Sequence, residues 1–247
     1  MHAAQKESVY FSYRGYCPIC EAEAVFTSKN EWFRDNLKCE TCEGGSRPRA
    51  RALALILTEM RPNWRDLAIH ESSPAPEGIS LKLKREASAY VASQYYPDHP
   101  FGSTIDGFQN EDLERQTFAD HVFDVVVTLD VMEHVYRPDL VFSEVFRTLK
   151  PGGLYLCTFP VRKYQVDGWE RRFTKSDDGE TIHHKEPEIH GNPIDGSGSI
   201  VTVDYGYDIH QQIARWAPFD VRVHRFSDRL HGIIGEYTEV FACKKPL

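Results

Sequence analysis

Long hydrophobic runs are missing from this sequence of 247 residues. No stretch approaches the roughly 20 consecutive apolar residues that a membrane-spanning helix needs, and the mean hydropathy is −0.48. Residues 1–7 also lack the apolar segment of a secretory signal. We therefore expect a cytoplasmic protein with no membrane partner.

An excess of positive charge is missing as well. The chain has 29 Lys and Arg against 37 Asp and Glu, and its formal net charge is −8. A general nucleic-acid surface would need a basic face, so this balance argues against general nucleic-acid binding. One basic cluster remains, Arg47, Arg49 and Arg51. We expect it to form a solvated first helical turn, and an anion contact is the alternative.

Cysteine is scarce, but four of the six cysteines form two Cys-x-x-Cys pairs, at Cys17, Cys20, Cys39 and Cys42. Four thiolates at tetrahedral corners suit Zn²⁺ and leave no open position, which predicts a structural zinc site. A redox motif would need only one pair, and disulfides would need an oxidising compartment. Cys157 and Cys243 lie in apolar runs, so we expect them to be buried.

Residues 1–47 are predicted to form a small zinc-binding lobe. The aromatic segment 10–45 is too short for a large core of its own, and zinc would supply the missing folding free energy. Residues 48–247 are predicted to form a second, larger domain. Its first element is a helix over residues 48–60, with a proline at its start and another just beyond its end.

Strand and helix patterns alternate through the larger domain. We expect further helices at 81–86, 138–149 and 207–217, and strands at 67–69, 89–92, 123–129, 154–159, 220–226 and 236–243. The β-branched run at 123–129 is typical of a strand buried on both faces of a parallel sheet. The alternation predicts an α/β fold with a doubly wound sheet. Residues 161–203 are polar and too long for an ordinary connection, so we expect an insertion there.

Two segments resemble a known family. Residues 123–135 read FDVVVTLDVMEHV, and residues 149–160 read LKPGGLYLCTFP. Together they resemble the class I S-adenosylmethionine-dependent methyltransferases, in the type 11-like subgroup with an FD…EHV…LKPGG signature. The resemblance implies a Rossmann-like, seven-stranded mixed sheet. It also implies S-adenosyl-L-methionine as cofactor, bound at the carboxyl ends of the strands.

The family's first motif corresponds to residues 70–78, after the first strand of the sheet. In the family, an acidic residue is followed by alternating glycines, which let the backbone approach the ligand closely. Here Glu71 stands for the acid, while Ser73 and Ala75 stand where glycines are usual. The resemblance implies that Glu71 and Ser73 lie at the cofactor.

The resemblance assigns further cofactor residues to the next three strands. Gln94 stands where an acidic residue usually holds the ribose hydroxyls, and it would bind them more weakly than a carboxylate. Asp112 and Leu113 match the adenine position. Asp130 is expected beside the methionine and the transferred methyl group, although its carboxylate would also suit a helix cap.

Histidines supply the candidate base. Methyl transfer to a hydroxyl group needs a positioned acceptor and a group that removes the proton, and histidine titrates in the right range. The candidates are His134 and three residues of the insertion, His183, His184 and His190. A packed core histidine is the alternative for His134, and an exposed polar loop is the alternative for the others. The histidines match no standard metal-ligand spacing, so a second metal site is the weaker interpretation.

The resemblance implies O-methylation of a small, polar, hydroxylated acceptor, saccharide-like or another metabolite. The alternative is a non-catalytic binding module, with a degenerate cofactor site and a zinc lobe that recruits a partner. A zinc-ribbon nucleic-acid methyltransferase is a third hypothesis, which the acidic balance disfavours. The sequence does not indicate an oligomeric state.

Overall fold

An eight-stranded sheet forms the centre of the structure, a computed structural model that describes residues 9–165, 168–176, 178, 180–191 and 198–247. Its strand order is β16-β17-β9-β8-β4-β5-β7-β6. Five neighbouring strands are parallel, namely β9 (Leu149–Thr158), β8 (Phe123–Leu129), β4 (Ala68–Ser72), β5 (Ala89–Gln94) and β7 (Phe108–Asn110). The chain runs outward in both directions from β4, so the expected doubly wound topology is confirmed.

Antiparallel strands complete both edges of this sheet. β17 (Val240–Lys244) pairs antiparallel with β9 and with the edge strand β16 (Asp220–His224). At the other edge, β6 (Thr104–Ile105) pairs antiparallel with β7. This two-residue strand is one more than the seven that the resemblance implied.

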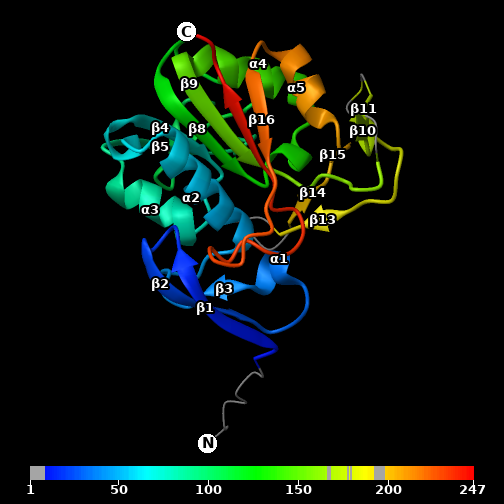
Figure 1. Cartoon of the computed structure of the whole chain (residues 1–247). Coiled ribbons are helices and arrows are strands. Elements are labelled where there is room, and N and C mark those ends of the chain that lie inside the picture. The colour runs from blue at the N-terminus through cyan, green and yellow to red at the C-terminus, as the bar shows by residue number, and fades with distance from the viewer. Residues whose placement is uncertain (1–8, 166–167, 177, 179, 192–197) are drawn as a thin grey trace, which may run out of the picture.

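Helices cover both faces of the sheet (Figure 1). One buried cluster joins α2 (Pro48–Met60) and α3 (Gly78–Glu86) to the sheet, and a second joins α4 (Pro138–Thr148) and α5 (Ile209–Trp216) to the other face. Along β8, Val125 belongs to the first cluster and Val126 to the second. Successive side chains of a strand point to opposite faces, which explains why this run is apolar throughout.

All of the predicted elements have a counterpart in the structure, and several of their boundaries differ. The helix over 48–60 and the strand over 123–129 have the predicted limits. The strand predicted at 154–159 already begins at Leu149, directly after α4, and the strand predicted at 236–243 begins only at Val240. Two short helices, η1 (Trp64–Asp66) and η2 (Met132–His134), precede β4 and follow β8. No helix of the described ranges is long and apolar enough to cross a membrane.

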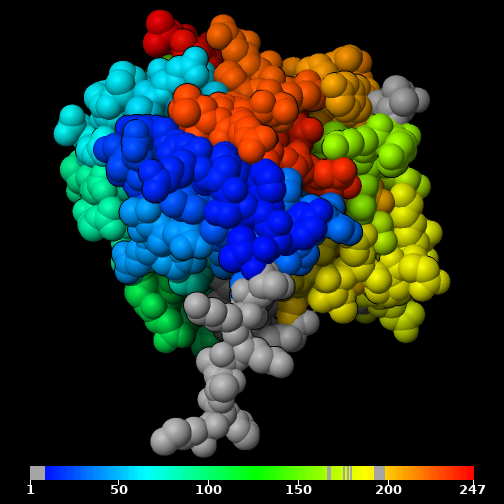
Figure 2. Space-filling view, turned by 60° about the horizontal axis from the view of Figure 1, so that its bottom comes forward, coloured from blue at the N-terminus to red at the C-terminus, as the bar shows by residue number. Residues whose placement is uncertain are grey.

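The N-terminal lobe is a three-stranded antiparallel sheet of β1 (Phe11–Cys17), β2 (Ala22–Ser28) and β3 (Lys38–Cys39), with the one-turn helix α1 (Phe33–Asn36). Its buried Phe26 and Leu37 belong to the same core cluster as Leu53 of α2. Figure 2 shows the lobe, in blue, lying against the C-terminal segment in orange and red. The backbone N–H of Tyr16 donates to the carbonyl of Leu230 at 2.8 Å. A division at residue 47 therefore stays a prediction, since the two parts share a core.

Short strand pairs occupy the region of the predicted insertion, at β10 (Trp169–Arg171), β11 (Phe173–Lys175), β12 (Thr181–His183), β13 (Ile189–His190), β14 (Ser199–Ile200) and β15 (Val203–Tyr205). This region is fastened to η2. The Thr202 N–H donates to the Glu133 carbonyl at 2.7 Å, and the Tyr205 hydroxyl donates to the Met132 carbonyl at 2.6 Å. The insertion therefore lies beside the carboxyl end of β8.

Candidate functional site

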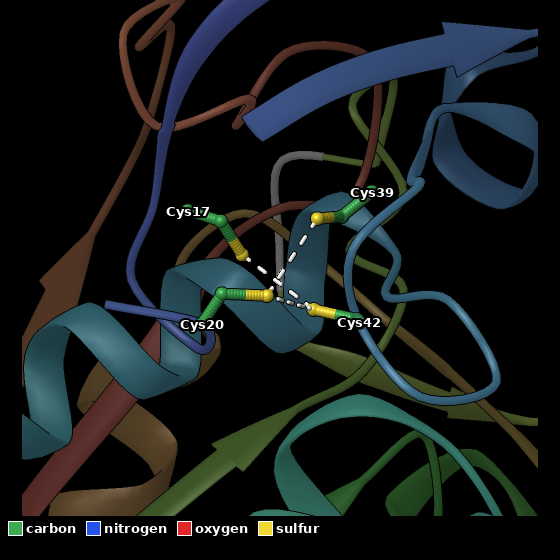
Figure 3. A group of neighbouring side chains, drawn as sticks. All are labelled: Cys17, Cys20, Cys39 and Cys42. Atoms are coloured by element: carbon green, nitrogen blue, oxygen red, sulfur yellow. Dashed lines mark hydrogen bonds between the residues drawn. The ribbon is translucent and has the colours of Figure 1, made fainter. Parts of the chain in front are cut away.

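The four cysteines of the two pairs converge on one point of the lobe (Figure 3), with all four sulfur atoms within 4.8 Å of one another. The Sγ–Sγ distance is 3.6 Å for Cys17 and Cys42, 3.9 Å for Cys20 and Cys39, and 3.1 Å for Cys20 and Cys42. A tetrahedral zinc with bonds of about 2.3 Å would hold its sulfurs about 3.8 Å apart. The arrangement fits a four-thiolate zinc site, as the spacing predicts.

Arg51 lies next to this cluster and is completely buried, so its prediction as a solvated residue is wrong. Its guanidinium group donates to the carbonyls of Leu37 at 3.0 Å and Gly232 at 2.6 Å, and also to the carbonyl of Ser46. Burial lowers the pKa of Arg51, and the neighbouring cysteine groups oppose that shift. Thiolates that bind zinc are negatively charged, and a buried cation beside them offsets part of that charge.

Arg49 is not solvated either, because it forms a largely buried ion pair with Asp130. Its Nε lies 2.6 Å from Asp130 Oδ2, and Nη2 of Arg34 in α1 lies 2.6 Å from the same oxygen. The other carboxylate oxygen accepts from Thr158 Oγ1 at 3.0 Å. Burial raises the pKa of the Asp130 carboxyl, but Arg49 and Arg34 outweigh this and hold it below its usual value. Arg34 of the lobe and Arg49 of α2 thus hold the carboxylate that follows β8.

One of the two glycine positions of the first motif has a left-handed backbone. Ser73, which stands where the family usually has glycine, has φ of 54°, in the left-handed region that favours glycine. Glu71 is buried and accepts from Ser80 Oγ at 2.5 Å and from the Tyr90 hydroxyl at 2.7 Å. Ser80 Oγ in turn accepts from the Ala75 N–H at 3.2 Å. Burial raises the pKa of Glu71 to about 7.

The remaining predicted cofactor residues follow adjacent strands. The Ser73 hydroxyl donates to Oε1 of the buried Gln94 at 2.9 Å, across the ends of β4 and β5. Asp112 follows β7, is partly exposed, and accepts from the Glu114 N–H at 2.9 Å, while Leu113 is buried. Amide and carboxylate oxygens at these strand ends are chemically suited to the ribose hydroxyls and adenine amine of the expected cofactor.

The N-terminal lobe also covers the first-motif loop, a contact that sequence analysis missed. Arg47 Nη1 lies 2.5 Å from Glu77 Oε1, and the Gly78 N–H donates to the Glu43 carbonyl at 3.3 Å. Gly44 has φ of 70°, and a Cβ there would come within 2.9 Å of the Pro76 carbonyl oxygen. The arginine cluster directly after the second cysteine pair was the available signal for this interface.

The structure separates the four candidate histidines into two groups. His134 and His190 lie together, with ring centroids 5.4 Å apart, beside the buried Glu133. Glu133 and Glu188 raise the pKa of His190 because both carboxylates favour its charged form. His183 and His184 are exposed at the β11–β12 hairpin. Sequence analysis did not assign Glu133, although it lies in the EHV part of the family signature.

Comparison with known proteins identifies a methyltransferase segment. Residues 81–157 match the family model described as Methyltransferase domain. A sterol 24-C-methyltransferase of Neurospora crassa is 27% identical over 99 residues, which are 40% of this chain. A fatty-acid O-methyltransferase of Mycolicibacterium smegmatis is 37% identical over 65 residues, which are 26% of this chain. The chain spans 23% of the length of each of these curated relatives.

Solved structures share the fold. A crystal structure of an S-adenosylmethionine-dependent methyltransferase from Mesorhizobium loti has a TM-score of 0.51 and 13% identity, covering 78% of this chain and 98% of that one. The PH0226 protein of Pyrococcus horikoshii has a TM-score of 0.51 and 15% identity, covering 81% of this chain and 90% of that one. At these identities, the likeness concerns the fold.

Proposed function

We propose that this chain, a member of the class I S-adenosylmethionine-dependent methyltransferases, transfers a methyl group from S-adenosyl-L-methionine to a hydroxyl group. The acceptor would be a small polar molecule, such as a saccharide-like metabolite. One observation carries the cofactor part of this proposal. Ser73, Gln94 and Asp112 lie at the carboxyl ends of three adjacent parallel strands, β4, β5 and β7, and Ser73 lies beside the point between β4 and β8 where the doubly wound sheet changes direction. Ligands of such sheets bind at that position.

Each of the strand-end residues would contact a different part of the cofactor. Gln94 would accept from the ribose hydroxyls, and Asp112 from the adenine amine above the apolar Leu113. The left-handed Ser73 brings the loop backbone to the methionine end, and Glu71 supports that loop through Ser80. When bound, the cofactor supplies an electrophilic methyl group on sulfur.

Asp130 has a different role in this proposal from direct cofactor binding. One carboxylate oxygen is held by Arg34 and Arg49 and the other by Thr158. We propose that Asp130 fixes the lobe against the end of β8 and so shapes the methionine end of the site. The acceptor would bind near His134 and His190, because these residues lie at the same strand end.

The zinc site has a structural role in this proposal. Four thiolate ligands leave no coordination position for a substrate. The lobe instead contributes Arg34 to Asp130, and the segment just after the second cysteine pair contributes Arg47 to Glu77 of the first-motif loop. Zinc would therefore act on catalysis only by holding the lobe that closes the cofactor site.

Calorimetric titration of the zinc-loaded full chain with S-adenosylhomocysteine tests the cofactor assignment. We expect Gln94→Ala and Asp112→Ala each to weaken binding about tenfold, the effect of losing one hydrogen bond of about 1.5 kcal/mol. Asp106→Asn is the matched control, because Asp106 is exposed at the β6–β7 turn, and its affinity should be unchanged. Absence of binding at millimolar ligand would contradict the proposal.

A non-catalytic binding module is the second candidate. The observation that favours it is the engagement of Asp130 by two arginines, together with serine and alanine at the glycine positions of the first motif. This candidate predicts a folded, zinc-loaded chain that binds no cofactor. The same titration therefore separates the two functions.

A further inference from the structure

Glu133 is a buried carboxylate without a hydrogen-bond partner among the described residues. Glu133 is 2% exposed, and neither of its carboxylate oxygens accepts a hydrogen bond. An unpaired buried charge costs several kcal/mol, so native structures almost always give such a group a partner. The atoms around Glu133 indicate what that partner is.

Both neighbouring histidines direct toward Glu133 the ring nitrogen that carries the lone pair in the neutral imidazole. His134 Nδ1 lies 2.8 Å from the Ile200 carbonyl, which can only accept, so Nδ1 carries the proton and Nε2 the lone pair. His190 Nε2 lies 3.1 Å from Glu188 Oε1 and donates to it, so the neutral imidazole that binds a metal ion has its lone pair on Nδ1. Arg162 holds the other Glu188 oxygen at 2.7 Å and so keeps this carboxylate in place.

The spacing of these atoms suits a cation and not a hydrogen bond. Glu133 Oε1 lies 3.7 Å from His190 Nδ1 and 3.9 Å from His134 Nε2, beyond the range of an N–H···O bond. All three ligand atoms lie within 4.8 Å of one another. Ligands about 2.1 Å from a shared metal ion are about 3.0 to 3.4 Å apart, so the two Glu133 separations would need to shorten by roughly half an ångström for an ion to bind.

We infer that Glu133, His134 and His190 form a second metal site, which binds a divalent first-row transition-metal ion. Two imidazoles and one carboxylate suit Mn²⁺, Fe²⁺, Co²⁺, Ni²⁺ or Zn²⁺ better than Mg²⁺ or Ca²⁺, and they leave coordination positions open for oxygen donors. Ile200 and Glu188 orient the two imidazoles from behind, as partners of metal-bound histidines generally do. The ion would join η2 to β13 of the insertion.

The open positions give the ion a role that rests on the proposed function. A metal-bound hydroxyl group has a lowered pKa, so an acceptor oxygen bound there would release its proton to solvent water more readily. His134 and His190 would then serve as ligands rather than as the free base that the sequence predicted. Metal binding itself is independent of methyl transfer, so it can be tested apart from activity.

Titration with Mn²⁺ followed by electron paramagnetic resonance tests the site on the zinc-loaded full chain. Mn²⁺ prefers oxygen and imidazole ligands and does not compete for four thiolates. We expect one Mn²⁺ per chain and at least about 100-fold weaker binding after Glu133→Gln, while Glu188→Gln should weaken it about tenfold. His183→Gln is the matched control, because His183 belongs to the same insertion but is exposed, and it should bind Mn²⁺ as the unmodified chain does.

A spectroscopic measurement on the unmodified chain tests the ligands without relying on the folding of the variants. Electron spin echo modulation should show nitrogen couplings from imidazole ligands of the bound Mn²⁺, and His190→Gln should reduce them. No stoichiometric Mn²⁺ binding, or equal binding by the chain and by Glu133→Gln, would overturn the inference. Neither result would bear on cofactor binding, which the calorimetric titration measures.

Discussion

Arg49 Nε, in the first turn of α2, lies 2.6 Å from Asp130 Oδ2 at the end of β8. This contact joins α2, the helix after the N-terminal lobe, to the carboxyl end of β8, where the methyl donor is expected. The side chains of both residues are largely buried, with exposed fractions of 12% and 15%. Helix α2 and the proposed site are therefore coupled through a charge pair that water screens only weakly.

Replacing Arg49 by methionine should destabilise the whole protein. The change would leave Asp130 with only Arg34 as a cationic partner, and breaking a buried ion pair costs roughly 3 kcal/mol. Urea denaturation measures the loss. Arg137→Met is the matched control, because Arg137 pairs with Asp139 at the surface and should cost less than about 1 kcal/mol. Equal losses in the two variants would contradict the coupling.

The cysteine cluster should hold one zinc ion per chain, measured by elemental analysis. Cys39→Ser should lose it, and the melting temperature should fall by roughly 10 °C, because Phe26 and Leu37 of the lobe share a core with α2. Cys157→Ala, at a buried cysteine outside the cluster, should keep the zinc. A Cys39→Ser protein that retains a full equivalent of zinc would rule out this ligand set.

Stability should depend on pH through Glu71. Burial raises the pKa of its carboxyl to about 7 in the folded protein, against an ordinary value of 4.5. The folded state then binds the proton more tightly, so this contribution to stability is full below about pH 4.5 and is lost as pH rises to about 7. From about pH 5 to pH 8 the loss is roughly 2 to 3 kcal/mol.

Glu71→Gln tests this assignment, because glutamine does not titrate. The free energy of unfolding of the variant, relative to the unmodified chain, should rise by that amount between the two pH values. Glu23→Gln is the matched control, since Glu23 is exposed on β2 and its difference should stay constant. A Glu71→Gln difference that does not change with pH would show that Glu71 is charged in both states.

Local patterns in the sequence were sufficient for the limits of α2 and β8 and for the cysteine cluster. The β-branched run of β8 and the prolines around α2 act within a few residues, so their limits could be predicted. The paired cysteines likewise predict one cluster, because each pair directs two sulfurs to the same point. The Ser73 backbone, by contrast, shows its left-handed geometry only in the structure, since the residue type does not require it.

The partners of the charged residues were decided by tertiary structure alone. Arg49 and Arg51 look like surface residues in the sequence, and they are buried only because the fold brings Asp130 and Gly232 to them. His134 meets His190 for the same reason, through an insertion that returns to η2. Whether a charge is solvated or buried depends on groups far away along the chain. Local sequence carries the periodicity of a helix or strand, and only the packed fold determines which side chains meet.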